Sequence, residues 1–128
     1  MDDAKLIEMA VDAARKAHCP YSHFQVGAAL LTQDGKIFSG CNVENASYGL
    51  TICAERTAIC SAIADGYQNF TSIAIVATRT ARPCGACRQF LAEFVKPTFR
   101  VLVASLSEAD AYQVYTMEEL LPHHFTFA

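Results

Sequence analysis

Two short segments of this 128-residue sequence carry side chains that suit metal chemistry. Cys53 is followed two positions later by Glu55, and Cys84 and Cys87 lie three positions apart after Pro83. Side chains three positions apart share one side of a helical turn, so Cys84 and Cys87 can bind one ion. Zinc binds thiolates readily, and three protein ligands leave its fourth tetrahedral position for water. The spacing therefore predicts a catalytic zinc site rather than a closed structural one.

Two residues beside Cys53 can serve such a site. In the first turn of a helix, Glu55 can lie next to the metal without binding it. A carboxylate in that place can take a proton from water and pass it on. Three thiolates also give the site an excess of negative charge, which opposes the loss of that proton. We therefore expect Glu55 to be catalytic, and we expect Arg56 to compensate the charge of the thiolates without binding the metal.

Hydrophobic spacing predicts the elements that must position these residues. The first helix should begin near Asp2 or Asp3 and be ended by Pro20, and a turn at residues 33–36 should close a hairpin. The expected strands span residues 24–32, 37–43, 72–78, 100–106 and 112–116, and the expected helices span residues 6–17, 53–65, 85–95 and 117–121. Strands that alternate with helices after a hairpin predict an α/β fold, with a mixed sheet covered on both faces.

Composition narrows the class of protein. A chain of 13.9 kDa suits a single domain over residues 1–128, and its hydrophobic fraction of 52% favours compact folding. The net charge of −3 argues against nucleic acid or an anionic membrane as a partner. Six cysteines are too few for a disulfide scaffold, and no secretory signal is recognisable. We therefore expect reduced thiols in a cytoplasmic protein, with Cys19, Cys41 and Cys60 as small core residues.

The sequence resembles the small homotetrameric cytidine deaminases in five motifs that extend over almost the whole chain. These are residues 24–29 (FQVGAA), 40–49 (GCNVENASYG), 53–58 (CAERTA), 83–89 (PCGACRQ) and 119–122 (ELLP). Zinc deaminases carry a His-x-Glu motif and a Pro-Cys-x-x-Cys motif, and in one variant a cysteine replaces the histidine. Cys53 stands in the place of that histidine. Arg82 departs from the pattern, because the family often has a small hydroxyl residue before the proline.

The resemblance implies a fold, a reaction and an assembly. The fold would be a three-layer α-β-α sandwich with a mixed five-stranded sheet. Cys53, Cys84 and Cys87 would bind one Zn²⁺ per subunit of a homotetramer whose sites are shared between subunits. The enzyme would convert cytidine and 2′-deoxycytidine to uridine and 2′-deoxyuridine with release of ammonia, in pyrimidine salvage. A zinc-activated water would attack the base, and Glu55 would shuttle the protons.

The same resemblance implies a set of residues that bind a nucleoside. They are Phe24, Asn42, Glu44, Ala46, Tyr48, Ala54 and Phe125. Asn42 and Glu44 would bind the ribose, the backbone N–H of Ala54 would bind the pyrimidine carbonyl, and Phe24 would line the base pocket. Phe125 would stack on the base in a neighbouring subunit, and Ala46 and Tyr48 would lie in a segment that reaches across subunits. A carboxylate at Glu44 would repel a phosphate group, which favours a free nucleoside over a nucleotide.

Four other interpretations are compatible with the cysteine spacing alone. The cysteines can be buried core residues, or Cys84 and Cys87 can form a redox pair. The chain can be a binding module around a closed structural zinc, which needs a fourth donor. It can also deaminate another aminated heterocycle, such as a nucleoside antibiotic. Zinc content separates the redox pair from the zinc site, because a dithiol oxidoreductase works without metal.

Overall fold

The computed structural model describes residues 2–127, and five strands form one mixed sheet in the order β2-β1-β3-β4-β5. The strands are β1 (Val26–Thr32), β2 (Ile37–Cys41), β3 (Phe70–Ala77), β4 (Arg100–Ser105) and β5 (Gln113–Thr116). β1 pairs antiparallel with β2 and with β3, and β4 pairs antiparallel with β5. β3 and β4 are parallel and are connected through a helix, as a parallel pair requires.

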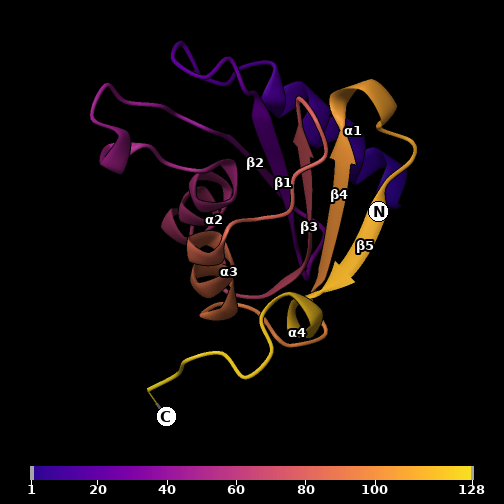
Figure 1. Cartoon of the computed structure of the whole chain (residues 1–128). Helices are drawn as coiled ribbons and strands as arrows, with labels where there is room; N and C mark the ends of the chain where they lie inside the picture. The colour runs from indigo at the N-terminus through magenta and orange to yellow at the C-terminus, as the bar shows by residue number, and fades with distance from the viewer. Residues whose placement is uncertain (1, 128) are drawn as a thin grey trace.

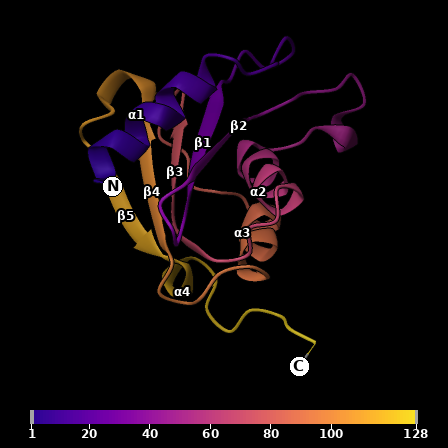
Figure 2. The same cartoon turned by 180° about the vertical axis from the view of Figure 1, so that it is seen from behind.

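Helices cover both faces of the sheet and give the predicted three-layer α/β sandwich (Figure 1). They are α1 (Asp3–Ala14), α2 (Ala54–Ala64), α3 (Gly85–Ala92) and the short α4 (Met117–Leu120). α1 lies on one face, and α2 and α3 lie side by side on the other (Figures 1 and 2). None of the helices in residues 2–127 has the length and apolar character that a bilayer span needs.

The central strand β3 has apolar side chains on both of its faces. Ile73 and Ile75 belong to the core beneath α2 and α3, whereas Ala74 and Val76 belong to the core beneath α1. All four side chains are at most 1% exposed. Because successive side chains of a strand point to opposite faces, a strand covered on both sides buries consecutive side chains, as residues 73–76 do. The continuous apolar run therefore places β3 between two helical layers.

Helix α2 packs against β2 at a glycine. A Cβ atom on Gly40 would lie 2.3 Å from Oγ1 of Thr57 and 2.5 Å from the backbone N of Ala58. Only glycine allows the helix backbone to approach the strand so closely. The Thr57 hydroxyl also donates a hydrogen bond of 3.0 Å to the carbonyl oxygen of Cys41. These contacts fix the position of α2, which starts immediately after Cys53.

The first helix ends earlier than its apolar spacing predicts. It stops at Ala14, so the prediction that Pro20 ends it is wrong. The chain beyond Ala14 instead pairs with a distant segment. The N–H of His18 donates to the carbonyl oxygen of Asn42 at 3.0 Å. The N–H of Glu44 donates to the carbonyl oxygen of His18 at 2.8 Å. These long-range backbone bonds replace further helical ones, and sequence periodicity does not reveal them.

Most other element ends lie close to the predicted ones. The hairpin, the later strands and the start of each helix are confirmed. β1 begins at Val26 rather than at residue 24, because the N–H of Gln25 is bound by the Thr78 hydroxyl at 2.9 Å instead of by a strand partner. α3 ends at Ala92 rather than at residue 95, where the chain turns before Pro97.

An ion pair connects the start of α1 to the start of β4. The Arg100 guanidinium donates hydrogen bonds of 2.9 and 2.7 Å to the two carboxylate oxygens of Asp3. The Tyr112 hydroxyl donates to the same carboxylate at 3.3 Å. The bonds from Arg100 lower the pKa of Asp3 from its ordinary value of 3.8, although partial burial opposes the shift. These contacts of Asp3 with Arg100 and Tyr112, which we call the Asp3 clamp, therefore stabilise the fold when Asp3 is ionised.

We predict that the contribution of this clamp to stability is lost in acid. Because the pKa of Asp3 is lower in the folded chain, the stabilisation is complete above the unfolded-state pKa and disappears as the pH falls through the folded one. At pH 7, Asp3→Asn should lower the free energy of unfolding by about 0.5 kcal/mol, since the pair is partly exposed to solvent. Urea unfolding at pH 7 and pH 2.5 measures the difference between variant and wild type, which should be smaller at the lower pH. Asp12→Asn on the same helix is the control, and an equal loss there would contradict the clamp.

Candidate functional site

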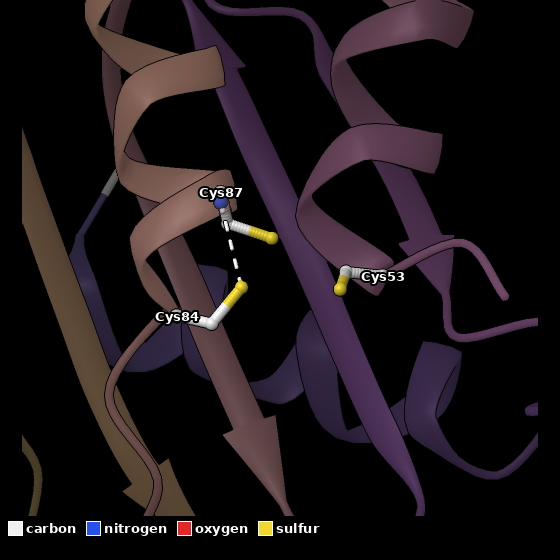
Figure 3. A group of neighbouring side chains, drawn as sticks. All are labelled: Cys53, Cys84 and Cys87. Atoms are coloured by element: carbon white, nitrogen blue, oxygen red, sulfur yellow. Dashed lines mark hydrogen bonds between the residues drawn. The ribbon is translucent and has the colours of Figure 1, made fainter. Parts of the chain in front are cut away.

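Three cysteine sulfurs meet where two helices begin. Cys53 caps the N-terminus of α2, Cys84 caps that of α3, and Cys87 lies in the first turn of α3. Their Sγ atoms all lie within 4.8 Å of one another and point toward a common centre (Figure 3). The N–H of Cys87 points at Sγ of Cys84, 3.5 Å away. The positive ends of two helix dipoles therefore face the sulfurs and favour their thiolate forms.

The donor set fits zinc. Two sulfurs bound to one tetrahedral zinc at the usual bond length of about 2.3 Å lie about 3.8 Å apart, which this cluster can reach with small side-chain shifts. All six cysteines are free thiols. In residues 2–127, no histidine, carboxylate or further cysteine joins the group. A closed structural site needs a fourth protein donor, so the cluster suits a site with one open position.

The three thiols do not share charge equally. A hydrogen bond from Cys87 lowers the pKa of Cys53 to about 5, helped by Arg56 and opposed by burial. The Arg56 guanidinium donates from Nη2 to Sγ of Cys53 at 3.5 Å. Donation to Cys53 raises the pKa of Cys87, and burial raises it further. The cluster alone thus favours a thiolate at Cys53 and a thiol at Cys87, and a bound divalent cation would favour ionisation of Cys87.

Glu55 is a buried carboxyl group beside these sulfurs. Its side chain is 4% exposed, and burial raises its pKa, as does the nearby charge of Cys53. It is outside the group of converging ligand atoms. Within residues 2–127 it has no ion-pair partner, and burial of that kind favours the protonated form of a carboxyl group, which can then donate a proton as well as accept one. The geometry therefore places a proton carrier next to, and not within, the set of thiol donors.

Glu55 and two of the cysteines line a cavity of about 200 Å³. Its walls are Phe24, Val26, Asn42, Thr51, Cys53, Ala54, Glu55, Ile75, Ala81, Arg82 and Cys84. A second cavity of about 360 Å³ is lined by Tyr21, Ser22, Glu44, Tyr48 and Thr51. Because Thr51 lines both, the two cavities are neighbours. The first has the size of a single heterocyclic ring, and the second offers a carboxylate and two phenol groups.

The structure places five of the residues expected to bind substrate at these cavities. Phe24, Asn42 and Ala54 line the first, and Glu44 and Tyr48 line the second. Neither Ala46 nor Phe125 lines either cavity. The Phe125 side chain is 66% exposed, and its carbonyl oxygen accepts a hydrogen bond of 3.2 Å from the Gln89 side chain.

Asn42 and Glu44 have protein partners that the sequence does not reveal. Oδ1 of Asn42 accepts from the N–H of Val26, and its Nδ2 donates to the carbonyl oxygen of Phe24, both at 2.9 Å. One oxygen of Glu44 accepts from the N–H groups of Tyr21 and Ser22 at 3.1 and 3.2 Å. The Ser22 hydroxyl donates to its other oxygen and lowers the pKa of Glu44. Both side chains therefore also shape the loop before β1.

Sequence reasoning missed several residues at the site. Thr51, Ala81 and Arg82 line the first cavity, although none was expected to bind substrate. The position of Arg82 beside Pro83 and Cys84 was the available signal for its place. The expectation for Cys60 is wrong, because this residue is exposed on α2, while Cys19 and Cys41 are half-buried.

Comparison with known proteins agrees with this geometry. The family described as "Cytidine and deoxycytidylate deaminase zinc-binding region" matches residues 1–103. A protein named "Cytidine deaminase" from Halalkalibacterium halodurans is 48% identical over 98% of this chain and 96% of its own length. A "Probable cytidine deaminase" from Dictyostelium discoideum is 58% identical over 70% of this chain, and the match spans 63% of that protein, just under two thirds of its length. A crystal structure of cytidine deaminase from Burkholderia pseudomallei is 50% identical, with a TM-score of 0.92 over 98% of this chain and 100% of that one.

We predict that Arg56→Ala weakens zinc binding by about tenfold or more, because it removes the positive charge that contacts the Cys53 sulfur. Nε of Arg56 is buried and has no partner in residues 2–127, whereas Nη2 bonds to the Cys53 sulfur. Competition with a chromogenic chelator measures the affinity. Arg56→Lys keeps the charge and should lie between Arg56→Ala and wild type. Wild-type affinity in Arg56→Ala would contradict the charge compensation.

Proposed function

Because this chain belongs to the cytidine and deoxycytidylate deaminase family, we propose that it is a zinc-dependent cytidine deaminase. It hydrolyses cytidine and 2′-deoxycytidine to uridine and 2′-deoxyuridine and releases ammonia. The observation that carries the proposal is the buried Glu55 beside three converging thiols on the wall of a ring-sized cavity. We place the reaction in pyrimidine salvage in the cytoplasm.

Cys53, Cys84 and Cys87 would hold one zinc ion per chain. When bound, zinc supplies a Lewis acid that makes water acidic enough to attack a carbon atom at neutral pH. The thiolates carry the ligand charge, and Arg56 together with two helix N-termini offsets part of it.

Glu55 is the proton carrier in the proposed reaction. It takes one proton from the attacking water and donates it to ring atom N3 of the cytosine base. It then transfers the second proton of that water to the amino group, which leaves as ammonia when the C4–N bond breaks. Burial raises the pKa of Glu55, so both its acid and its base forms are accessible during the reaction. Water and cytidine thus become ammonia and uridine, and Glu55 returns to its starting state.

The cavity walls favour a neutral nucleoside. Phe24 provides an aromatic wall for the base. The Asn42 side chain donates a hydrogen bond to the Phe24 carbonyl oxygen and so holds Phe24 in place. The N–H of Ala54, at the first position of α2, has no partner within residues 2–127 and could bind the pyrimidine carbonyl. Glu44 has lone pairs left for a ribose hydroxyl besides its bonds to Tyr21 and Ser22. Its negative charge repels the phosphate of a nucleotide.

A homotetramer would complete the site. The segment before α2 projects from the sheet and exposes Tyr48 (75%), Leu50 (65%) and Ile52 (44%) (Figure 1). Contiguous exposed apolar side chains of this kind mark interaction surfaces. Phe125 is also exposed and lies away from the cavity of its own chain. We propose that Ala46, Tyr48 and Phe125 contact substrate bound in a neighbouring subunit.

We predict that the purified protein contains one zinc per chain and converts cytidine to uridine, and that Glu55→Gln keeps the zinc but loses turnover. The amide has nearly the shape of the carboxyl group but cannot carry protons, so the rate should fall at least about 10³-fold. Elemental analysis and the absorbance change of the base measure the two properties. Cys60→Ser, at an exposed cysteine, is the matched control and should keep both. Equal turnover in Glu55→Gln and wild type would refute the shuttle, and absence of zinc would favour a redox pair.

We also predict that light scattering gives the mass of four chains for the wild type. Replacement of both Tyr48 and Leu50 by serine removes exposed apolar surface and should yield smaller species with little turnover, because each site would lose its neighbour. Val114→Ser, at an exposed apolar side chain of β5, is the control and should leave the assembly intact. A monomeric wild type with full turnover would contradict shared sites.

A further inference from the structure

We propose that Arg82 is a positioning residue for the zinc site. Held by Tyr115 of strand β5, it fixes the loop that carries Cys84 and forms one wall of the cavity. The inference rests on the proposed function, because it concerns the metal and substrate of that same site. It adds the edge of the sheet to the parts of the molecule that build the site.

Arg82 reaches from the loop between β3 and α3 to the last strand. Its Nε donates a hydrogen bond of 2.9 Å to the Tyr115 hydroxyl, and its guanidinium lies 5.4 Å from the centre of the Tyr115 ring. The Tyr115 hydroxyl in turn donates to Oε1 of Gln113 at 2.7 Å. The hydroxyl thus accepts from Arg82 and donates to Gln113, which fixes its direction. Tyr115 is anchored in the sheet by its register opposite Val101.

The loop has few other attachments. Its first residue, Thr78, bonds to Gln25 through both backbone and side chain. In the described part of the chain, residues 79–82 make no backbone–backbone hydrogen bond. Arg79 contacts the Phe24 ring at 5.0 Å, the Arg82 side chain bonds to Tyr115, and Ala81 is half-buried. Loss of the bond to Tyr115 should therefore loosen the segment between Thr78 and the buried Pro83.

Arg82 lies close to Cys84 along the chain, so we expect the position of Arg82 to influence that of Cys84. One residue, Pro83, separates them, and its ring fixes the backbone angle φ. The Pro83 carbonyl oxygen accepts a hydrogen bond of 2.8 Å from Nε of Arg88 on α3. Arg88 also donates to the carbonyl oxygen of Leu120, again at 2.8 Å. The approach to Cys84 is thus held from two sides, by β5 through Arg82 and by α4 through Arg88.

Arg82 and Cys84 also share the cavity wall with Phe24 and Glu55. A looser loop should therefore change two properties. It should weaken zinc binding, because a sulfur ligand that is less fixed before binding loses more freedom on binding. It should raise KM for cytidine while kcat with saturating zinc stays within about twofold, since Glu55 keeps its surroundings.

The test compares Tyr115→Phe, Arg82→Ala and the double variant with the wild type. Tyr115→Phe keeps the ring and removes the hydroxyl that accepts from Arg82. Zinc affinity is measured by competition with a chelator, which needs no substrate. Each single variant should bind zinc about three- to tenfold more weakly than the wild type. The zinc affinity of the double variant should equal that of the single variant with the lower affinity. Arg82→Lys keeps a donor for Tyr115 and should recover part of the loss.

Tyr112→Phe is the matched control, because it removes a hydroxyl that bonds to Asp3 just before the same strand. It should leave zinc affinity and KM unchanged. Wild-type zinc affinity in Tyr115→Phe would overturn the inference. Additive effects in the double variant, or an equal loss in Tyr112→Phe, would also overturn it. If Arg82→Ala fails to fold, as thermal unfolding would show, Tyr115→Phe and Arg82→Lys still decide.

Failure of this inference differs from failure of the proposed function. A wild type that binds zinc but leaves cytidine unchanged refutes the function, while the zinc affinities of the variants still test the role of Arg82. A wild type that turns over cytidine, with all variants like it, refutes the positioning role and leaves the function in place. A wild type that binds no zinc refutes both.

Discussion

Mutual repulsion among three sulfur atoms is the constraint on which this structure depends. Without a cation, the cluster favours a thiolate at Cys53, supported by a proton on Cys87 and by the Arg56 guanidinium. Helices α2 and α3 both begin at this point, and their N-terminal ends supply positive potential where the sulfurs meet. A site built from neutral ligands would not need two aligned helix starts and an adjacent arginine.

The two ligand segments are held by different parts of the sheet. The position of Cys53 depends on the contact of α2 with Gly40 and on the bond from Thr57 to Cys41, both at the end of edge strand β2. Cys84 depends on the loop after β3 and on the contacts of Arg82 and Arg88 with β5 and α4. An ion bound by both segments would link the two ends of the sheet. Metal binding and folding should therefore stabilise each other.

The sequence predicted the features that arise from local spacing. The helix starts at Cys53 and Cys84 follow from a few adjacent residues, and the alternating burial of β3 follows from its apolar run. Contacts between distant segments could not be predicted. The early end of α1 depends on backbone bonds between His18 and Asn42, and the place of Arg82 depends on Tyr115, 33 residues further along the chain. Such contacts are set by the packing of complete elements, which no local pattern specifies.

The cavities support the view that one chain does not form a complete site. In the proposed reaction the base would occupy the cavity of about 200 Å³ beside Glu55, and the sugar would lie toward the neighbouring cavity that Glu44 lines. Binding sites usually enclose most of a ligand, and the second cavity is bordered by the exposed side chains of Tyr21 and Tyr48. A nucleoside spanning both cavities would leave its sugar open to solvent. Another copy of the chain, with its own exposed Phe125, has the apolar surface that can cover it.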